Sequence, residues 1–174
     1  MNSILQTPYH YSFYLYGKIR TTLSYYFPSY LQPNISEIYP NIFVGNLSSI
    51  IDKETLHQKK ITHILSAVSG VFPVYPTEFT YMNLDLLDEP TFNIKPFFNE
   101  SNNFFEKASN SNNKILVHCI CGVSRSVTLA CAYLIYKYHM SPTQALEHIQ
   151  NKRPIANPNP GFMEQLKQFY IETN

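Results

Sequence analysis

The sequence lacks the features that would place it in a membrane, outside the cell or on nucleic acid. No apolar run approaches the ~20 residues that a membrane-spanning helix needs. The formal net charge is only +1 across 174 residues, so no overall field attracts nucleic acid. Only three cysteines occur, an odd number that does not suggest a disulfide framework. We therefore expect a protein of the cytoplasm or nucleus that binds no nucleic acid and has no transmembrane segment.

Acidic residues are absent from the first part of the chain. Residues 1–34 contain no Asp or Glu, whereas nine aromatic residues crowd into them. A charged start and a small-residue cleavage site are missing, so the segment does not resemble a signal peptide. We expect an extension that packs on the domain formed by residues 35–174 and hides its aromatic side chains. The alternatives are a homodimerising arm, a helix on a membrane surface, and a flap that contacts a substrate.

The most informative segment that is present is His-Cys-Ile-Cys-Gly-Val-Ser-Arg-Ser at residues 118–126. It follows an apolar run at 114–118, typical of a short buried strand, and precedes one at 127–138, long enough for a buried helix. The segment is therefore predicted to be a loop that joins a strand to a helix. Such a loop points backbone N–H groups at one spot, and the helix N-terminus adds partial positive charge there. This arrangement favours binding of a dianion similar to phosphate.

The residue types in this loop match that chemistry. Cys119, at the base of the loop, is expected to be held as a thiolate, which is a nucleophile toward phosphorus. Arg125 offers a planar fork of donors that matches two phosphate oxygens. Gly122 lets the backbone turn and come close to the ligand. Ser124 and Ser126 carry hydroxyls that bond the loop or the thiolate, and Ser126 is placed to stabilise the sulfur as it leaves.

The pattern His-Cys-x-x-Gly-x-Ser-Arg-Ser resembles the signature of the cysteine-dependent protein tyrosine phosphatases, specifically their dual-specificity branch. Further blocks at residues 41–46, 61–65 and 153–166 resemble segments of that branch in the same order. The resemblance covers about residues 35–170 and points to a small, atypical member of the family. It implies that residues 35–174 form a catalytic domain that works through a phosphocysteine, with no cofactor and no metal.

The resemblance also implies a set of site residues. The expected phosphate-binding residues are Ile120, Cys121, Gly122, Val123, Ser124 and Arg125. The expected catalytic residues are Cys119, Arg125, Ser126 and an acid at Asp88, with His118 and Asn159 in support.

Other interpretations of the loop stay open at this point. His118 also fits an ordinary histidine at the end of a buried strand, and Cys119, Cys121 and Cys131 also fit small buried hydrophobic residues. A zinc site from His118, Cys119 and Cys121 is conceivable, although no second Cys/His pair lies at ligand spacing. Cys121, a second thiol in the loop, departs from the family pattern. We expect it to be a spectator, with a redox role as the alternative.

A phosphatase of this kind needs a proton donor for the leaving group. Asp88 is the first candidate, because it lies on a predicted loop and 31 residues before Cys119 (119 − 88), a spacing similar to the family's. Asp85 is the rival candidate, expected at a strand end as a solvated or capping residue, and Glu89 is a weaker one. A solvated acidic turn is the alternative for all three.

Predicted strands and helices alternate along the chain, as in α/β proteins. We predict a central mixed, mostly parallel sheet of about five strands, flanked by helices, with the phosphate loop between a strand and a helix. Ser141-Pro142-Thr143-Gln144 has the form of a capping box with proline at the first helical position. The expected strands lie at 36–45 (one or two), 61–67, 81–86 and 114–118, and the expected helices at 52–60, 93–109 and 127–138, with two more that begin near Ser141 and Asn159.

Two residues near the end of the matched region carry separate predictions. Arg153 is expected to be a solvated arginine at a helix end, with a second anion contact as the alternative. Asn159 resembles the family asparagine that braces the phosphate loop, and it also fits the N-cap of the last helix.

The substrate class is inferred from what the loop lacks. No lysine lies between Cys119 and Arg125, whereas the phosphoinositide branch of the superfamily typically carries basic residues there. The chain shows no counterpart of the long loop that deepens the pocket of tyrosine-specific enzymes. The resemblance thus implies hydrolysis of phosphotyrosine and of phosphoserine or phosphothreonine in phosphoproteins. The alternatives are a phosphoprotein-binding module and a phosphatase for a non-protein phosphate ester.

Overall fold

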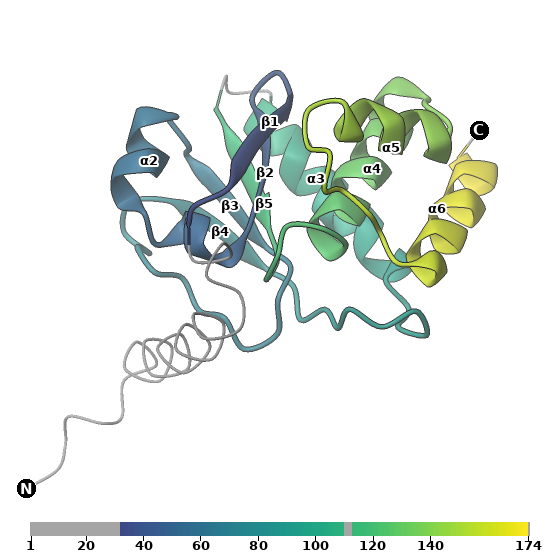
Figure 1. The fold of residues 1–174 in the computed structure, drawn as a ribbon, viewed down its shortest axis with the longest axis horizontal. Coiled ribbons are helices and arrows are strands. Elements are labelled where there is room, and N and C mark those ends of the chain that lie inside the picture. Colours follow the sequence, from purple (N-terminus) through teal and green to yellow (C-terminus); the bar gives the residue numbers. More distant parts are fainter. Residues whose placement is uncertain (1–31, 110–112, 174) are drawn as a thin grey trace, which may run out of the picture.

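The computed structural model describes residues 32–109 and 113–173, and the expectations for residues 1–31 lie outside them. Within the described residues, five strands form one sheet in the order β1-β2-β5-β3-β4 (Figure 1). Their bounds are β1 (Ile35–Tyr39), β2 (Ile42–Gly45), β3 (His63–Ser66), β4 (Thr80–Asn83) and β5 (Ile115–His118).

The sheet is mixed, as predicted. β1 and β2 pair antiparallel, and Asn41 turns the chain between them at φ 67°, a conformation that asparagine adopts more readily than most residues. The pairs β2–β5, β5–β3 and β3–β4 are all parallel. The prediction of a mostly parallel sheet is therefore confirmed, with two strands in the segment 36–45.

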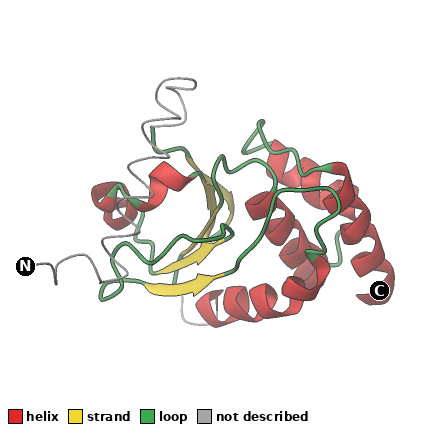
Figure 2. Cartoon of the chain, turned by 90° about the horizontal axis from the view of Figure 1, so that it is seen from below, coloured by secondary structure: helices red, strands yellow, loops and turns green. Residues whose placement is uncertain are grey.

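The central strands separate two apolar cores. In β5, Ile115 and Val117 contribute to the larger core, whereas Leu116 contributes to the smaller one. A strand buried on both faces reads as a continuous apolar run, which is the pattern seen at 114–118. Figure 2 shows the long helices on one side of the sheet and the short ones on the other. The long helices are α3 (Phe98–Ser109), α4 (Arg125–Tyr138), α5 (Pro142–Gln150) and α6 (Pro160–Thr173), and the short ones are η2 (Leu47–Ile50) and α2 (Lys53–Gln58).

Helix α4 is the central helix of the larger core. Every residue from Ser126 to Ile135 is buried, which confirms the buried helix predicted from the apolar run. The helix begins at Arg125, two residues before the predicted start, so the last two residues of the motif at 118–126 belong to the helix. The next helix, α5, has the predicted capping box, with Gln144 N donating to Ser141 Oγ and Ser141 N donating to Gln144 Oε1.

The strand predicted at 81–86 is wrong at its end. β4 stops at Asn83, because β3, its one neighbour among the described strands, stops at Ser66. Leu84 N donates to Ser66 O, and the chain then leaves the sheet. Residues 84–94 are called the acid loop from here on.

The single helix predicted at 93–109 is also wrong at its start. A short 3₁₀ helix, η3 (Lys95–Phe97), precedes α3. Pro96 has no N–H to donate into a longer helix. The N–H groups of Ile94 and Lys95 are both bonded to a side chain from α6. The residues before Phe98 thus follow a path other than that of the predicted helix.

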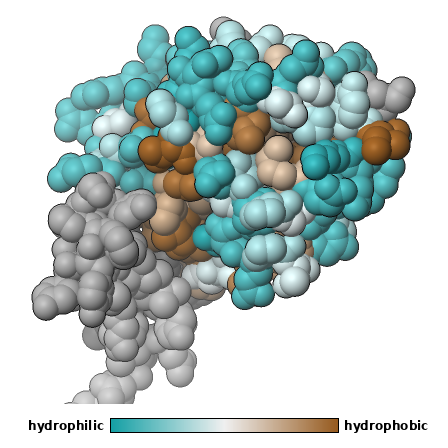
Figure 3. Space-filling model, turned by 45° about the vertical axis from the view of Figure 1, so that its right-hand side comes forward, coloured by the Kyte–Doolittle hydropathy of each residue, from teal (hydrophilic) through white to brown (hydrophobic). Residues whose placement is uncertain are grey.

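The surface matches a domain that has buried its apolar residues. On the face shown in Figure 3, hydrophilic residues cover most of the area, and hydrophobic ones form smaller patches between them. Among residues 32–109 and 113–173, no helix combines the length and the apolar character required to cross a membrane.

Candidate active site

The phosphate loop, residues 119–124, joins the central strand β5 to α4. Partners outside the loop bind several of its carbonyl oxygens: Leu47 N donates to Ile120 O (3.0 Å), and Asn157 N donates to Val123 O (2.9 Å). The C=O and N–H of one peptide group point in opposite directions. Carbonyls bonded outward therefore leave the following N–H groups directed toward the inside of the loop, where an anion binds.

Gly122 is required by the shape of this loop. Its φ is +67°, in the left-handed region that favours glycine. A Cβ there would lie 2.6 Å from Gly45 O and 2.5 Å from Arg153 Nη2. This geometry is consistent with the prediction that glycine lets the loop turn, and it adds a close approach to Gly45 and Arg153.

Cys119 lies at the base of the loop and is only 1% exposed. Gly122 N donates to its Sγ at 3.2 Å, and Ser126 Oγ donates to it at 3.3 Å. The N-terminus of α4 follows the loop directly and contributes partial positive charge. Two hydrogen-bond donors and the N-terminus of α4 thus surround the sulfur.

Arg125 and Asp88 meet beside the loop. Arg125 Nε lies 3.4 Å from Asp88 Oδ2, and Arg125 Nη1 donates to Leu86 O at 3.1 Å. Asp88 Oδ1 accepts from Ser124 Oγ at 2.7 Å. The side chain of Asp88 is 33% exposed and that of Arg125 is 11% exposed, so both remain accessible to a ligand.

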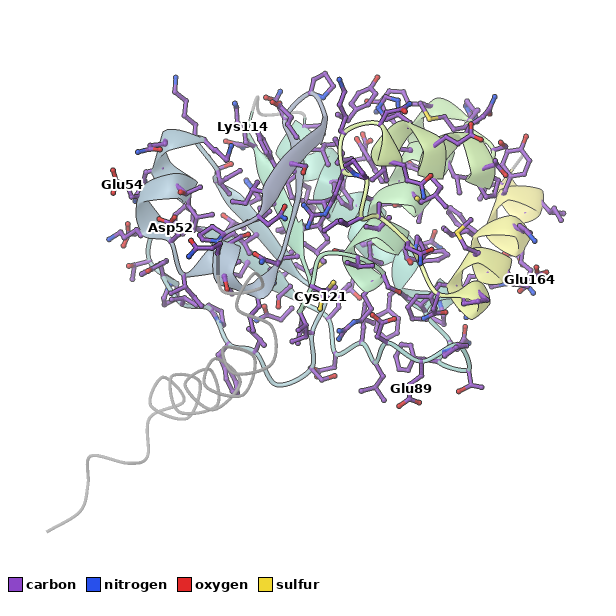
Figure 4. The ribbon with its side chains drawn as sticks, viewed as in Figure 1. Asp52, Glu54, Glu89, Lys114, Cys121 and Glu164 are labelled. Carbon is purple, nitrogen blue, oxygen red and sulfur yellow. The ribbon has the colours of Figure 1, made fainter. Side chains whose placement is uncertain are left out.

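The rival acids are placed differently. Asp85 is exposed, and its Oδ1 accepts from Gly70 N at 3.4 Å. In Figure 4, Glu89 lies at the lower edge of the molecule, below Cys121, and its carboxylate points outward. Asp88 is thus the candidate that the fold brings to the phosphate loop.

Asn159 has both of the features predicted for it. Its Oδ1 accepts from Phe162 N at 3.0 Å, as an N-cap of α6 does. Its backbone N donates to Ser124 Oγ (3.1 Å), and its Nδ2 donates to Asp88 Oδ1 (3.0 Å). Asn159 therefore links α6 to the phosphate loop and to the acid loop.

The prediction of a solvated Arg153 is wrong, because the residue is only 1% exposed. Arg153 Nε donates to Gly122 O at 2.7 Å, and Nη1 donates to Asn34 Oδ1 at 2.7 Å and to Ser36 Oγ at 3.2 Å. Its guanidinium thus joins β1 and the residues before it to the phosphate loop. These contacts leave it facing protein oxygens instead of solvent.

Burial sets the titration of three other residues near the site. His118 is fully buried, which lowers its pKa from 6.5 to about 4, so the ring is neutral at pH 7. Burial, and then the neighbouring Cys119, raise the pKa of the Cys121 thiol. Cys131 is buried inside α4, and burial alone raises the pKa of its thiol. Among the residues that the structure describes, no three His, Cys, Asp or Glu side chains gather as metal ligands.

Sequence reasoning missed the residues that hold the site from outside. Gln165 of α6 binds the backbone of the acid loop, and Gly161 lies against Pro90. Both fall in or beside the block 162–166, whose sequence resembles the family but does not indicate these contacts. The sequence signal for the role of Gln165 is weak: it is a polar residue on the inner side of an amphipathic helix.

Comparison with known proteins identifies the family. Residues 42–172 match the family described as "Dual specificity phosphatase, catalytic domain". The chain belongs to the dual-specificity phosphatase family. It is accordingly a protein phosphatase of the dual-specificity class, and the resemblance seen in the sequence is confirmed.

Three known proteins are similar to this chain over most of their own length. Dual specificity protein phosphatase 1B of Arabidopsis thaliana is 37% identical over 136 residues, which are 78% of this chain and 81% of that protein. The crystal structure of DUSP15 is 35% identical, with a TM-score of 0.75, 78% of this chain covered and 86% of that one. The human tyrosine phosphatase-like serine/threonine/tyrosine-interacting protein is 31% identical, with a TM-score of 0.75 and coverage of 79% and 96%. These structures confirm the predicted α/β fold.

Proposed function

We propose that this phosphatase hydrolyses phosphotyrosine and phosphoserine or phosphothreonine in proteins through a phosphocysteine at Cys119. The observation that carries the proposal is the meeting of Asp88 with the phosphate loop, through Ser124 at 2.7 Å and Arg125 at 3.4 Å. A nucleophile, an anion clamp and an acid at one place are the parts that phosphate-ester hydrolysis needs. A module that only binds phosphoproteins has no need of the acid.

The proposed reaction has two steps. First, the Cys119 thiolate forms an S–P bond while the P–O bond to the leaving oxygen breaks, and Asp88 gives its proton to that oxygen. Second, a water oxygen bonds to phosphorus, its proton passes to Asp88, and the S–P bond breaks. Ser126 Oγ, at 3.3 Å from Sγ, donates to the sulfur as it leaves. The products are the free side chain and inorganic phosphate.

Arg125 has a role in both steps. Its guanidinium matches two oxygens of the phosphoryl group, and it stabilises the charge that develops on them. A phosphate dianion attracts the guanidinium more strongly than a single carboxylate does. Substrate binding is therefore expected to draw Arg125 from Asp88 and leave Oδ2 free to face the leaving oxygen.

The neutral rim of the loop supports a protein substrate. Residues 120–123 are Ile-Cys-Gly-Val and carry no charge, and Arg153 is buried behind Gly122. Arg125 is thus the cation that the loop itself offers to a ligand. One arginine and a set of N–H groups suit the single phosphate of a modified side chain better than a polyphosphorylated headgroup.

The compartment that we propose is the cytoplasm or nucleus. Cys119, Cys121 and Cys131 are all free thiols in the structure. A catalytic thiol has to stay reduced, and glutathione and thioredoxin keep thiols reduced in those compartments.

The test compares Cys119→Ser, Asp88→Asn and the matched control Asp85→Asn on phosphopeptides and on p-nitrophenyl phosphate. Cys119→Ser is expected to reduce phosphate release to background, and vanadate, but not EDTA, to inhibit the wild type. Asp88→Asn is expected to lower kcat on phosphotyrosine peptide by roughly 10²–10⁴-fold, and much less on p-nitrophenyl phosphate, whose leaving group needs little protonation. Asp85→Asn is expected to behave as wild type.

Two results would contradict the proposal. Full activity in Cys119→Ser would remove the phosphocysteine. A leaving-group-dependent loss in Asp85→Asn, with normal rates in Asp88→Asn, would move the acid to Asp85.

A further inference from the structure

The acid loop has little internal support of its own. Residues 87–91 are all exposed, and the loop leaves the sheet after Leu84. The one bond recorded between its own backbone groups is the turn from Phe92 N to Glu89 O, at 3.0 Å. The position of Asp88 therefore depends on what lies against the loop.

Helix α6 lies against the loop. Asn159, at its N-cap, donates to Asp88 Oδ1. Gly161, in its first turn, approaches so closely that a Cβ would come within 1.8 Å of Pro90 O. Near the other end of the helix, Lys95 Nζ pairs with Glu172 Oε1 at 2.6 Å. The helix thus contacts the loop and the start of η3 along several turns.

Gln165 makes the densest of these contacts. Its Oε1 accepts from Ile94 N (2.8 Å) and from Lys95 N (3.0 Å), and its Nε2 donates to Phe92 O (2.9 Å). Both ends of one amide are therefore bonded to backbone groups of Phe92, Ile94 and Lys95. The opposite placement of O and N would leave all three bonds unmade, so the assignment of the amide is determined by its partners.

These bonds fix the path of the chain just after the acid. Phe92 lies four residues beyond Asp88, and the turn from Glu89 to Phe92 and the close fit of Pro90 join the two points. A backbone held at Phe92, Ile94 and Lys95 leaves Asp88 little freedom. Without Gln165, two N–H groups and one carbonyl lose their partner, and the loop has to rearrange to satisfy them.

We propose that Gln165 is a positioning residue for the general acid: it holds the acid loop so that Asp88 lies over the phosphate loop. The inference rests on the proposed function of Asp88. It predicts that loss of the glutamine harms the protonation of the leaving group in particular, and not binding or nucleophilic attack.

The test uses Gln165→Met, which keeps the length of the side chain and removes its hydrogen bonds. Gln168→Met is the matched control, because it makes the same change at an exposed position of the same helix. On phosphotyrosine peptide, Gln165→Met is expected to lower kcat by roughly 10- to 100-fold, since misplacing a reacting group by about 1 Å can cost about 10²-fold. On p-nitrophenyl phosphate, its rate is expected to stay within about threefold of wild type, because general-acid help contributes little there.

A double-mutant cycle with Asp88→Asn separates positioning from a structural role. In the Asp88→Asn background, Gln165→Met should add no further leaving-group-dependent loss, because the group it positions is gone. The proposal would be overturned if Gln165→Met lowered kcat equally on both substrates. It would also be overturned if Gln165→Met caused the same loss in the Asp88→Asn background as in the wild type. If Gln165→Met does not fold, Gln165→Glu, which keeps the two acceptor bonds, is measured in the same cycle and read by the same criteria. The Asp88→Asn arm alone reports on the proposed function, so failure of one idea can be told from failure of the other.

Discussion

Two arginines reach the phosphate loop, and they do so in different surroundings. Arg125 is partly accessible, and its contacts are one backbone oxygen and a carboxylate at 3.4 Å. Arg153 is buried, and its guanidinium is bonded to Gly122 O, Asn34 and Ser36. The partly exposed arginine keeps donors for a ligand, whereas the buried one uses its donors to fix the backbone. The same residue type is thus placed to bind the phosphate, as proposed, on one side of the loop, and it fixes the shape of the loop on the other.

The buried arginine also differs in its electrostatics. Its recorded hydrogen-bond acceptors are neutral oxygens. Burial lowers its pKa, and the nearby Cys119 opposes that change. An arginine stays protonated under these conditions. Arg153 therefore keeps its charge while its donors stay bonded to buried protein oxygens.

The sharpest test of this comparison exchanges each arginine for lysine, which keeps the charge and removes the planar fork. Arg125→Lys is expected to lower kcat by roughly 10²–10³-fold, the range found when one donor to a developing oxyanion is lost. Its free energy of unfolding should change little. Arg153→Lys should instead lower the free energy of unfolding by about 1–3 kcal/mol for each buried acceptor left without a donor.

Steady-state kinetics give kcat for each variant, and urea denaturation gives the free energy of unfolding of each. The comparison fails if Arg153→Lys unfolds like wild type, or if Arg125→Lys loses stability rather than turnover.

His118 provides a second test of the buried surroundings. Its pKa is lowered by burial from 6.5 to about 4, so between these values the unfolded chain binds a proton that the folded protein does not. Stability attributable to His118 is therefore full above pH 6.5 and falls as the pH drops toward 4. The loss at pH 4 is expected to be roughly 3 kcal/mol, from about 1.4 kcal/mol per pKa unit.

Urea denaturation from pH 7 to pH 4 measures this loss. The difference in pH dependence between wild type and His118→Leu isolates the histidine from the carboxylates. Identical pH slopes in the two proteins would show that the ring is not held neutral.

The smallest expected effect concerns the chain before β1. The domain boundary proposed from the sequence, after residue 34, cuts through contacts of the fold: Asn34 Oδ1 accepts from Arg153, and Asn34 N donates to Asn46 Oδ1 at 3.2 Å. Deleting residues 1–31 should preserve turnover of p-nitrophenyl phosphate. Deleting residues 1–34 should cost a further 1.5–3 kcal/mol or so of stability, the range for a hydrogen bond to a charged group.

Thermal unfolding of the two truncated proteins checks the difference. Light scattering and liposome co-sedimentation of the full chain and of the shorter truncation test whether residues 1–31 mediate self-association or lipid binding. Strong lipid binding by the full chain alone would favour the membrane-surface alternative over packing on the domain.

Local patterns explain why much of the fold was predictable from the sequence. The capping box at Ser141 is decided by four adjacent residues, and the apolar runs around the phosphate loop have lengths that distinguish a strand from a helix. The end of β4 could not be predicted, because it depends on where β3 stops. The burial of Arg153 depends on Gly122, 31 residues away (153 − 122), and a solvated arginine at a helix end has the same sequence.

The order in which the ribosome makes these parts has a consequence for biosynthesis. Cys119 and Arg125 are synthesised well before Asn159, Gly161 and Gln165, which hold the acid loop from α6. Domains generally fold as units while the chain emerges. A nascent chain that ends before residue 159 already contains the proposed nucleophile and the proposed acid, but it lacks the α6 contacts that hold the acid loop. Under the proposed mechanism, the nascent chain becomes competent only after α6 (Pro160–Thr173) has left the ribosome.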